Sequence, residues 1–253
     1  MQNEILESAI SLVKECGERL RSERFSHIRK KAGCYDLVSD LDEEIENYLI
    51  AQLSHRYPSH HFIGEEQHVG SGLDLWIIDP IDGTTNFINA HEDFAISVAY
   101  YHDQKPVFGV VYDVMRDELF VGIHKQGSYC NGQKLQIKQD KEVSDCVLDM
   151  SLHTMHSIDK AYGKSMLELQ GKIRGHRSLG CASLCICHIA NRTLDVYLSM
   201  HLKCWDYAAA AIILKEAGGY FDIAEDFFTM TSTGAVFTNH SSIQQYFLEN
   251  FMK

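Results

Sequence analysis

The sequence predicts a mixed fold of helices and strands in two halves, an α+β half over residues 1–142 and an α/β half over residues 143–253. Three observations support this prediction. Two amphipathic helix patterns precede the first strand pattern, several strand patterns then follow with only turn-length gaps, and from about Val147 strand and helix patterns alternate. Consecutive strands with short connections are typical of antiparallel sheets, whereas alternation is typical of α/β layers. We place the boundary near residues 140–145.

The N-terminal half begins with two predicted helices. In "MQNEILESAISLVKECGERL" apolar side chains recur at helical spacing among charged ones. A second helix is predicted over "SDLDEEIENYLIAQLSHRYP", with Ser39 or Asp40 as the N-cap and an end before Pro58. Residues 30–38, between the two helices, are predicted to form an exposed polar turn.

The strands of this half follow as short apolar runs. They are "HFIG", "LWIID", "AISVAYY", "PVFGVVYD" and "ELFVGIH". The segment "YCNGQKLQI" then predicts a hairpin, because Asn-Gly is a favoured two-residue turn. Together these runs predict one large antiparallel sheet.

In the C-terminal half, strand patterns alternate with helix patterns. The strand candidates are "VLDM", "LDVYLSM", "GGYFDI" and "AVFTN". The helix candidates lie near residues 157–170, 181–192, 204–217 and 241–251. This alternation predicts a second sheet with helices packed against it.

Composition and charge argue against several functional classes. The chain has 23 Lys and Arg against 35 Asp and Glu, a net charge of −12, so we expect no broad attraction to nucleic acid or to an anionic membrane. No apolar run is long enough to span a bilayer, and the N-terminus lacks the residue order of a signal peptide. Eight cysteines at irregular spacing indicate reduced, mostly buried thiols. We therefore expect a cytoplasmic protein.

The segment "WIIDPIDGTTNF", residues 76–87, is the most informative stretch for function. A strand ending in "WIIDP" places Asp79 at a sheet edge, where Pro80 is predicted to end the strand, so that Asp79 and Asp82 face one point. Gly83 permits close backbone approach, and a helical turn beginning at Thr84 would offer its amides to an anion. Divalent cations between the carboxylates and a phosphate would remove the repulsion, because Mg²⁺ prefers hard oxygen ligands. The alternative is an ordinary β-turn, since Asp-Pro and Asp-Gly are common in turns.

Other acidic residues favour the metal site. Glu65, in "HFIGEE", precedes Asp79 by fourteen positions, a spacing that lets adjacent strands bring both to one rim. Asp206 lies in the first turn of the apolar helix that begins at "CWDYAAAA", where it is a candidate ligand. The alternatives are a solvated surface charge for Glu65 and a helix-capping role for Asp206.

The elements "GEE", "DPIDGTTNF" and "CWDYAAA", in this order and at these separations, resemble the inositol monophosphatase family of lithium-sensitive, Mg²⁺-dependent phosphomonoesterases. The resemblance also covers "YPSHHFIGEE", "FGVVYD", "YCNGQKLQI" and "EAGG", and so runs through most of the chain. It implies an alternating α-β-α-β-α layered sandwich of the sugar-phosphatase type and a homodimer. It also implies a small phosphorylated substrate.

The resemblance implies a specific set of metal ligands for two or more Mg²⁺ per active site. These ligands are Glu65, Asp79, the carbonyl of Ile81, Asp82 and Asp206. Asp42, in "DLVSDLD", matches a family acid near a more loosely held metal. Its alternative is a charge on the surface of the helix.

The implied mechanism begins with a metal-activated water. One cation, held by Glu65, Asp79 and Ile81, would lower the pKa of a bound water. Thr84, paired with Glu65, would orient or deprotonate that water. The nucleophile is then water rather than a side chain, which predicts direct hydrolysis.

A second cation completes the implied mechanism. Shared by Asp79, Asp82 and Asp206, it would neutralise the phosphate and the departing alkoxide. The amides of Gly83 and Thr84 would hold nonbridging oxygens. On this mechanism, loss of Asp82 or Asp206 lowers turnover by orders of magnitude.

The predicted substrate contacts differ from the family pattern at two positions. Inositol-hydrolysing members have a glutamate on the strand before the WD element, and the matching residue here is Ser199. The segment "RSLGCAS" matches one that lines the substrate pocket, so Gly180, Cys181 and Ala182 are expected to approach the substrate through backbone groups, together with Asp206. Cys181 stands where many members have threonine.

We therefore predict hydrolysis of inositol 1-phosphate. NADP, a nucleotide 3′-phosphate, histidinol phosphate or another sugar phosphate remain alternative substrates. A regulatory protein that binds the transcription or ribosome machinery is the alternative of another class, because an acidic surface permits a protein partner. An intact ligand set argues against a purely noncatalytic role.

Overall fold

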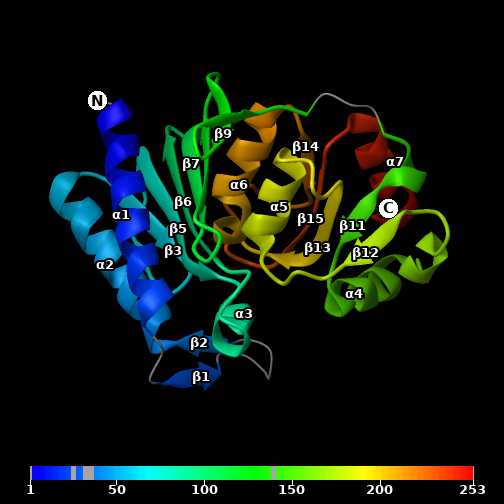
Figure 1. Ribbon diagram of the computed structural model, residues 1–253, viewed down its shortest axis with the longest axis horizontal. Helices are drawn as coiled ribbons and strands as arrows, with labels where there is room; N and C mark the ends of the chain where they lie inside the picture. The colour runs from blue at the N-terminus through cyan, green and yellow to red at the C-terminus, as the bar shows by residue number, and fades with distance from the viewer. Residues whose placement is uncertain (1, 24–26, 31–36, 138–140, 253) are drawn as a thin grey trace.

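Helices and sheets alternate along the long axis of the computed structural model (Figure 1). The structure describes residues 2–23, 27–30, 37–137 and 141–252. The helices of these residues are α1 (Gln2–Ser22), α2 (Asp40–Arg56), α3 (Thr84–Asn89), α4 (Leu152–Tyr162), α5 (Ala182–Ala190), α6 (Cys204–Ala217) and α7 (Ser241–Phe251), with 3₁₀ turns η1 (Val143–Asp145) and η2 (Met166–Leu169). Within the described ranges, no helix is both long and apolar enough to cross a lipid bilayer.

The strands form two large sheets and one small hairpin. Those of the N-terminal half are β1 (Ile28–Lys30), β2 (Leu37–Ser39), β3 (His61–Gly64), β4 (His68–Val69), β5 (Asp74–Asp82), β6 (Ala95–His102), β7 (Lys105–Asp113), β8 (Glu118–Ile123), β9 (Gly127–Cys130) and β10 (Gln133–Leu135). Those of the C-terminal half are β11 (Val147–Asp149), β12 (Gly175–Arg177), β13 (Val196–Leu202), β14 (Tyr220–Ile223) and β15 (Thr233–Thr238).

Five layers result from the packing of these elements. Helices α1 and α2 cover one face of the first sheet, α5 and α6 lie between the two sheets, and α4 and α7 cover the outer face of the second sheet (Figure 1). The predicted α-β-α-β-α sandwich is therefore confirmed.

The first sheet has eight strands in the order β10-β9-β8-β7-β6-β5-β3-β4. Its pairs are antiparallel except β3 with β5, which is parallel. The predicted antiparallel sheet is thus correct apart from this pair. The reason is the two-residue strand β4, which was not predicted: it reverses the chain after β3, so that β5 enters alongside β3 in the same direction.

The second sheet has five strands in the order β12-β11-β13-β15-β14, with parallel pairing of β11 to both of its neighbours.

The helix predicted over 157–170 is wrong in its bounds. Ser151 caps α4 by accepting a hydrogen bond from the Thr154 amide at 3.1 Å, so the helix begins earlier. Gly163, with φ +63°, ends it in the left-handed conformation.

Two connecting segments lie partly outside the described residues. The exposed turn predicted over 30–38 is a hairpin where it is described, because β1 pairs with β2 in antiparallel register. Residues 31–36 lie outside the described residues. Residues 138–140, at the predicted boundary between the halves, also lie outside them, and that boundary stays a prediction.

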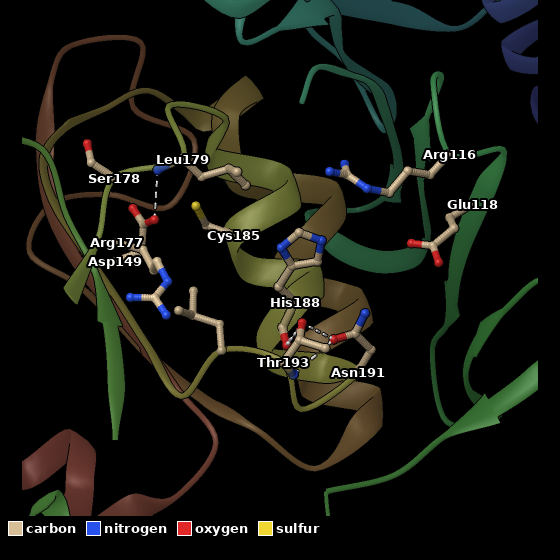
Figure 2. A pocket seen from close by; sticks show the side chains of 11 residues that line it. Arg116, Glu118, Asp149, Arg177, Ser178, Leu179, Cys185, His188, Asn191 and Thr193 are labelled. Carbon is tan, nitrogen blue, oxygen red and sulfur yellow. Dashed lines mark hydrogen bonds between the residues drawn. The ribbon is translucent and has the colours of Figure 1, made fainter. Parts of the chain in front are cut away.

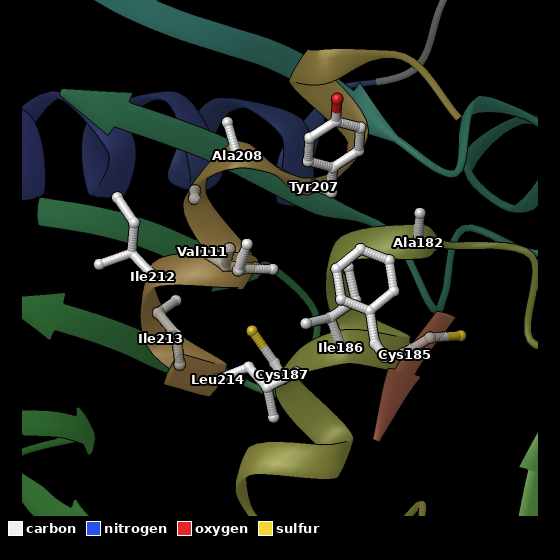
Figure 3. Close-up of a cluster of buried hydrophobic side chains, with 14 of the residues drawn as sticks. Val111, Ala182, Cys185, Ile186, Cys187, Tyr207, Ala208, Ile212, Ile213 and Leu214 are labelled. Carbon is white, nitrogen blue, oxygen red and sulfur yellow. The ribbon is translucent and has the colours of Figure 1, made fainter. Parts of the chain in front are cut away.

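Three hydrophobic clusters fill the spaces between the layers. One joins α1 and α2 to the first sheet, one joins α5 and α6 to both sheets, and one lies between the second sheet and α4 and α7. Figure 3 shows the middle cluster, in which Ile186 and Cys187 of α5 lie near Ile213 and Leu214 of α6. Because both faces of the first sheet are covered, its strands are continuously apolar, as "AISVAYY" is.

Helix α6 approaches the first sheet unusually closely. Gly109 of β7 and Gly122 of β8 lie opposite each other across the ladder. A Cβ on Gly109 would be 2.2 Å from the carbonyl oxygen of Ala209, and one on Gly122 would be 2.7 Å from the Cα of Ile213. The two glycines therefore make a side-chain-free strip against which the backbone of α6 lies.

The cysteines of the described residues carry free thiols. Six of these seven are buried, and Cys130 is half-buried. Burial raises the pKa of the Cys16 thiol to about 12, which keeps it protonated and unreactive at neutral pH.

His60 should make the free energy of unfolding depend on pH. Its Nδ1 lies 2.9 Å from the Trp76 indole nitrogen, which donates to it, and its ring stacks on Tyr57 and Tyr100. Burial lowers the pKa of His60. The folded state then binds fewer protons than the unfolded state, so this stabilisation is complete above the unfolded pKa of about 6.5 and is lost as the pH falls.

We expect His60→Phe to reduce the loss of unfolding free energy between pH 7.5 and pH 5.5, measured by urea denaturation at each pH. His55→Phe, at an exposed position of α2, is the matched control and should follow the wild-type pH dependence. Parallel curves for His60→Phe and wild type would contradict the prediction.

Candidate active site

A β-bulge in β5 brings two aspartates to the same face of the sheet. Asp79 pairs with Ser97 and Asp82 pairs with Ala95, so three steps along β5 match two steps along β6. In a regular strand, residues three apart face opposite sides, but the extra residue turns Asp82 to the side of Asp79. Pro80 lies inside the bulge, where proline is tolerated. The prediction that Pro80 ends the strand is therefore wrong, since β5 continues to Asp82.

Gly83 links the bulge to α3 in a conformation that requires glycine. Its φ is +90° and ψ +37°, and α3 begins at the next residue, Thr84, as predicted. A Cβ on Gly83 would lie 3.1 Å from the Asp93 carbonyl oxygen, 3.2 Å from the Cys181 Cβ and 3.4 Å from the Gly180 carbonyl oxygen. The absent side chain therefore lets the 180–181 segment close against the bulge.

Asp82 is held at the N-terminus of α5. Its carboxylate accepts hydrogen bonds from the Ala182 amide at 3.1 Å, the Ser183 amide at 2.5 Å and the Cys181 thiol at 3.1 Å. Burial raises the pKa of Asp82, and these donors partly oppose that rise. Ser183 was not identified from the sequence. A small polar residue in the first turn of a predicted helix is the signal that could have found it.

Asp42 is fully buried, so the surface-charge alternative for it is wrong. It accepts hydrogen bonds from the Ser39 amide at 2.9 Å and the Ser39 hydroxyl at 2.5 Å, and Ser39 is the N-cap of α2, one of the two predicted caps. Burial raises the pKa of Asp42 to about 6. The Thr84 hydroxyl lies 3.0 Å from Asp42 Oδ1 and 3.0 Å from the Ile81 carbonyl oxygen. The Thr84 hydroxyl therefore has these two acceptors, and its predicted pairing with Glu65 stays a prediction.

Glu65 and Asp79 share one rim of the first sheet. The parallel register of β3 and β5 places Gly64 beside Ile78, so Glu65 follows next to Asp79, as the fourteen-residue spacing predicted. Burial raises the pKa of the Asp79 carboxyl, and among its charged neighbours Glu65 raises it most. Glu65 is half-buried rather than a solvated surface charge.

Asp206 both caps α6 and faces Asp82. Its Oδ2 accepts a hydrogen bond from the Lys203 amide at 2.7 Å, so the capping role is present. Burial raises the pKa of Asp206 well above its usual range, and the charge of Asp82 raises it further. Asp206 therefore caps α6 and still lies close enough to Asp82 for their charges to interact.

Five acidic side chains thus form an acidic cluster: Asp42, Glu65, Asp79, Asp82 and Asp206. Burial, followed by the charges of the other four, raises the pKa of Asp79 well above its usual range. Among the described side chains, no three acidic, histidine or cysteine groups are already arranged to hold a metal ion. Asp82 and Asp206 instead accept hydrogen bonds from backbone amides. The donor chemistry nevertheless fits a hard divalent cation, because crowded carboxylates are otherwise costly to ionise together.

Ser199 lies on β13 with its side chain buried. Its hydroxyl accepts a hydrogen bond from the His201 amide at 3.3 Å. Tyr197 lies two residues earlier on the same face of the strand. Burial raises the pKa of its phenol well above the usual range, and nearby Cys185, Asp82 and Asp206 raise it further. The strand therefore runs past the acidic cluster, with Ser199 beyond Tyr197.

A cavity of 480 Å³ lies along α5, and none of the acidic cluster lines it (Figure 2). Asp149 in this cavity accepts a hydrogen bond from the Leu179 amide at 2.8 Å. Arg116 is paired with Asp113 at 2.8 Å and with Asp93 at 2.6 Å, so its charge is already compensated. We therefore locate the candidate active site by the acidic cluster rather than by this cavity.

Comparison with known proteins gives one consistent family. The sequence model of the inositol monophosphatase family matches residues 1–253. Inositol monophosphatase 1 from Sus scrofa is 34% identical over 252 residues, covering 95% of this chain and 91% of that protein. Inositol-1-monophosphatase from Bacillus subtilis (strain 168) is 33% identical over 258 residues, covering 98% and 97%.

Solved structures agree with this assignment. Inositol monophosphatase-II from Staphylococcus aureus MSSA476 superimposes with a TM-score of 0.81 at 26% identity, covering 98% of this chain and 95% of that chain. Structures of SaIMPase-II hold inositol monophosphate in one case and 2′AMP in another.

Proposed function

The chain belongs to the inositol monophosphatase family of metal-dependent phosphoric monoester hydrolases, and we propose that its own substrate is inositol 1-phosphate and its metal Mg²⁺. The acidic cluster carries this proposal. Five crowded carboxylates, three of them buried, present only oxygen donors, and Mg²⁺ binds such donors. The bound cation would supply positive charge that polarises the phosphate and makes a water molecule more acidic.

We assign the Mg²⁺ ligands to Glu65, Asp79, the Ile81 carbonyl, Asp82 and Asp206, with Asp42 at the edge of the site. The folded chain sets the direction of these groups before any substrate arrives. The α5 amides fix the Asp82 carboxylate, and the Lys203 amide fixes the Asp206 carboxylate. Such prior orientation lowers the reorganisation needed during the reaction.

Thr84 is assigned to orient the attacking water. Its hydroxyl proton is directed at Asp42 Oδ1 or at the Ile81 carbonyl, each 3.0 Å away. The hydroxyl oxygen then has a lone pair left to accept a hydrogen bond from the water. The amides of Gly83 and Thr84 are assigned to the nonbridging phosphate oxygens, because they lie at the start of α3, where the first backbone amides have no partner within the helix.

The alcohol part of the substrate is assigned to contact the segment Gly180, Cys181 and Ala182 as well as Ser199. The inositol monophosphate held by SaIMPase-II supports inositol 1-phosphate as the first candidate. The 2′AMP held by the same protein supports a nucleotide as a second candidate, as does the short side chain of Ser199, which leaves room for a larger group. NADP and a nucleotide 3′-phosphate belong to this second class, and histidinol phosphate or another sugar phosphate are further candidates.

The purified protein is expected to release inorganic phosphate from inositol 1-phosphate only when Mg²⁺ is present. The assay compares inositol 1-phosphate, 2′-AMP, NADP, histidinol phosphate and fructose 1,6-bisphosphate, each with Mg²⁺ and with EDTA. The highest kcat/KM identifies the preferred substrate. Release that is equally fast in EDTA would contradict the metal assignment, and no release from any compound by folded protein would contradict the substrate class.

We further propose that the protein acts as a homodimer in the cytoplasm. The family resemblance supports the dimer. The free, buried thiols of the described residues support a reducing compartment, because oxidising compartments favour disulfides. Sedimentation velocity decides the oligomeric state.

A further inference from the structure

Glu46 is a buried acid that the proposed mechanism does not use. It lies on α2 four residues after Asp42, so the two side chains share one face of the helix. Glu46 is 0% exposed, and its Oε1 has no hydrogen-bond partner within the described structure. A fully buried glutamate is rare unless neighbouring groups form hydrogen bonds or ion pairs with it.

The groups around Glu46 belong to the tight turn that carries Glu65. Strands β3 and β4 form a hairpin, and the Gly64 amide donates to the Gln67 carbonyl oxygen at 2.8 Å. Glu65 and Glu66 are therefore the two central residues of the turn. Two-residue hairpins favour turns with positive φ at the first central residue, yet the positive φ values of the described chain do not include Glu65 or Glu66. The turn therefore lacks the backbone conformation that usually stabilises a two-residue hairpin, and we infer that contacts with other segments hold it in place.

Glu46 provides that support through its carboxylate. Its Oε2 accepts a hydrogen bond from the Glu66 amide at 3.0 Å, and the nearby Gln67 amide lowers the pKa of the Glu46 carboxyl, against the larger rise from burial. The backbone directly after Glu65 is thus bound to one side chain of α2. The same helix holds the turn a second time, where the Gln67 side-chain amide donates to Asn47 Oδ1 at 2.7 Å.

Gly64 makes the contact possible from the other side. A Cβ at this position would lie 2.5 Å from both Cδ and Oε2 of Glu46 and 2.7 Å from Oε1. The carboxylate therefore occupies the space where any other residue would place its side chain. The glycine of the "GEE" element is explained by the glutamate that lies against it.

We propose that Glu46 is a positioning residue that fixes the 64–67 turn and thereby aims the Glu65 carboxylate at the rim it shares with Asp79. This inference rests on the proposed function, because it assumes that Glu65 binds Mg²⁺. Glu46 acts through the turn backbone and touches neither metal nor substrate.

The test measures Mg²⁺ binding by titration calorimetry, without any substrate. Glu46→Ala removes the acceptor of the Glu66 amide and should weaken Mg²⁺ affinity about 10- to 100-fold, as losses of outer ligand partners do. Glu46→Gln restores an acceptor oxygen without the charge and should stay within about threefold of wild type. Glu44→Ala, an exposed acid on the same helix, is the matched control and should bind as wild type does.

A double-mutant cycle separates positioning from a general loss of structure. In a Glu65→Gln background, Glu46→Ala should change Mg²⁺ affinity by less than about threefold, because the side chain that Glu46 aims is already lost. An equal loss in both backgrounds would overturn the proposal. So would a Glu46→Gln affinity as weak as that of Glu46→Ala, since the charge alone would then be responsible.

Gly64→Ala provides an independent variant in case Glu46→Ala does not fold. Its Cβ displaces the Glu46 carboxylate and should weaken Mg²⁺ binding as Glu46→Ala does, whereas unchanged binding by folded Gly64→Ala would overturn the proposal. Failure of the proposed function would look different. In that case the wild type itself would bind no Mg²⁺ and release no phosphate, whereas a wild type that binds Mg²⁺ no more tightly than Glu46→Ala contradicts only the positioning role.

Discussion

Asp82→Asn is expected to lower kcat for phosphate release by at least about 10²-fold, the loss typical of removing one preorganised group that stabilises developing charge. The direction of the Asp82 carboxylate is fixed by three donors, from Cys181, Ala182 and Ser183, at the start of α5. Asparagine keeps the size of the side chain but removes its charge. The cation would then have one fewer anionic ligand where the leaving group departs.

The measurement is kcat at saturating Mg²⁺ and substrate, with the melting temperature as the folding check. Asp103→Asn is the matched control, since Asp103 lies in the exposed turn after β6 and pairs with neighbouring Lys105 at 3.2 Å. The control should keep wild-type turnover. An Asp82→Asn protein with more than a tenth of wild-type kcat would contradict the assignment of Asp82 to the reaction.

Gly109→Ala is expected to destabilise the protein by about 1–3 kcal/mol or more, the range for overpacking a filled core. The new Cβ would lie 2.2 Å from the carbonyl oxygen and 2.8 Å from the Cα of Ala209. Both are backbone atoms of α6, so no side-chain rotation relieves the clash and the helix itself must move. Because α6 carries Asp206 in its first turn, phosphate release should fall as well.

Urea denaturation of the variant and the wild type gives the difference in unfolding free energy. Gly175→Ala is the matched control: a Cβ there meets only a guanidinium nitrogen of Arg177, at 3.5 Å, so little loss is expected. Equal stabilities of Gly109→Ala and wild type would show that α6 is less tightly packed against β7 than the structure indicates.

The sequence predicted the elements whose pattern is local. The strands from β5 to β8 are apolar runs between turn residues, and α6 is an uninterrupted apolar helix, so each could be identified without its neighbours. Strands β4 and β12 are two and three residues long, which is too short for a periodic pattern. The parallel pairing of β3 with β5 could not be predicted, because it depends on the chain reversal at β4.

The candidate site shows the same division. The aspartates of "DPIDGT" stand close together in the sequence, so their convergence could be predicted, although the bulge that produces it could not. The burial of Asp42 depends on Thr84 and Ser39, which come together only in the folded chain. Glu46 has no motif of its own, and only its spacing of four residues from Asp42 points to a common face.

The central position of α6 has a consequence for synthesis of the chain on the ribosome. All strands of the first sheet have been made once Leu135 is added, whereas α6, which covers their inner face, begins only at Cys204. Until α5, from Ala182, and then α6 have been made, Ala99, Val111 and Phe120 on that face have no helix to pack against. The emerging chain therefore exposes an apolar sheet face that a chaperone can protect, and Asp206, the last of the proposed metal ligands, arrives on the helix that completes the cover of this face.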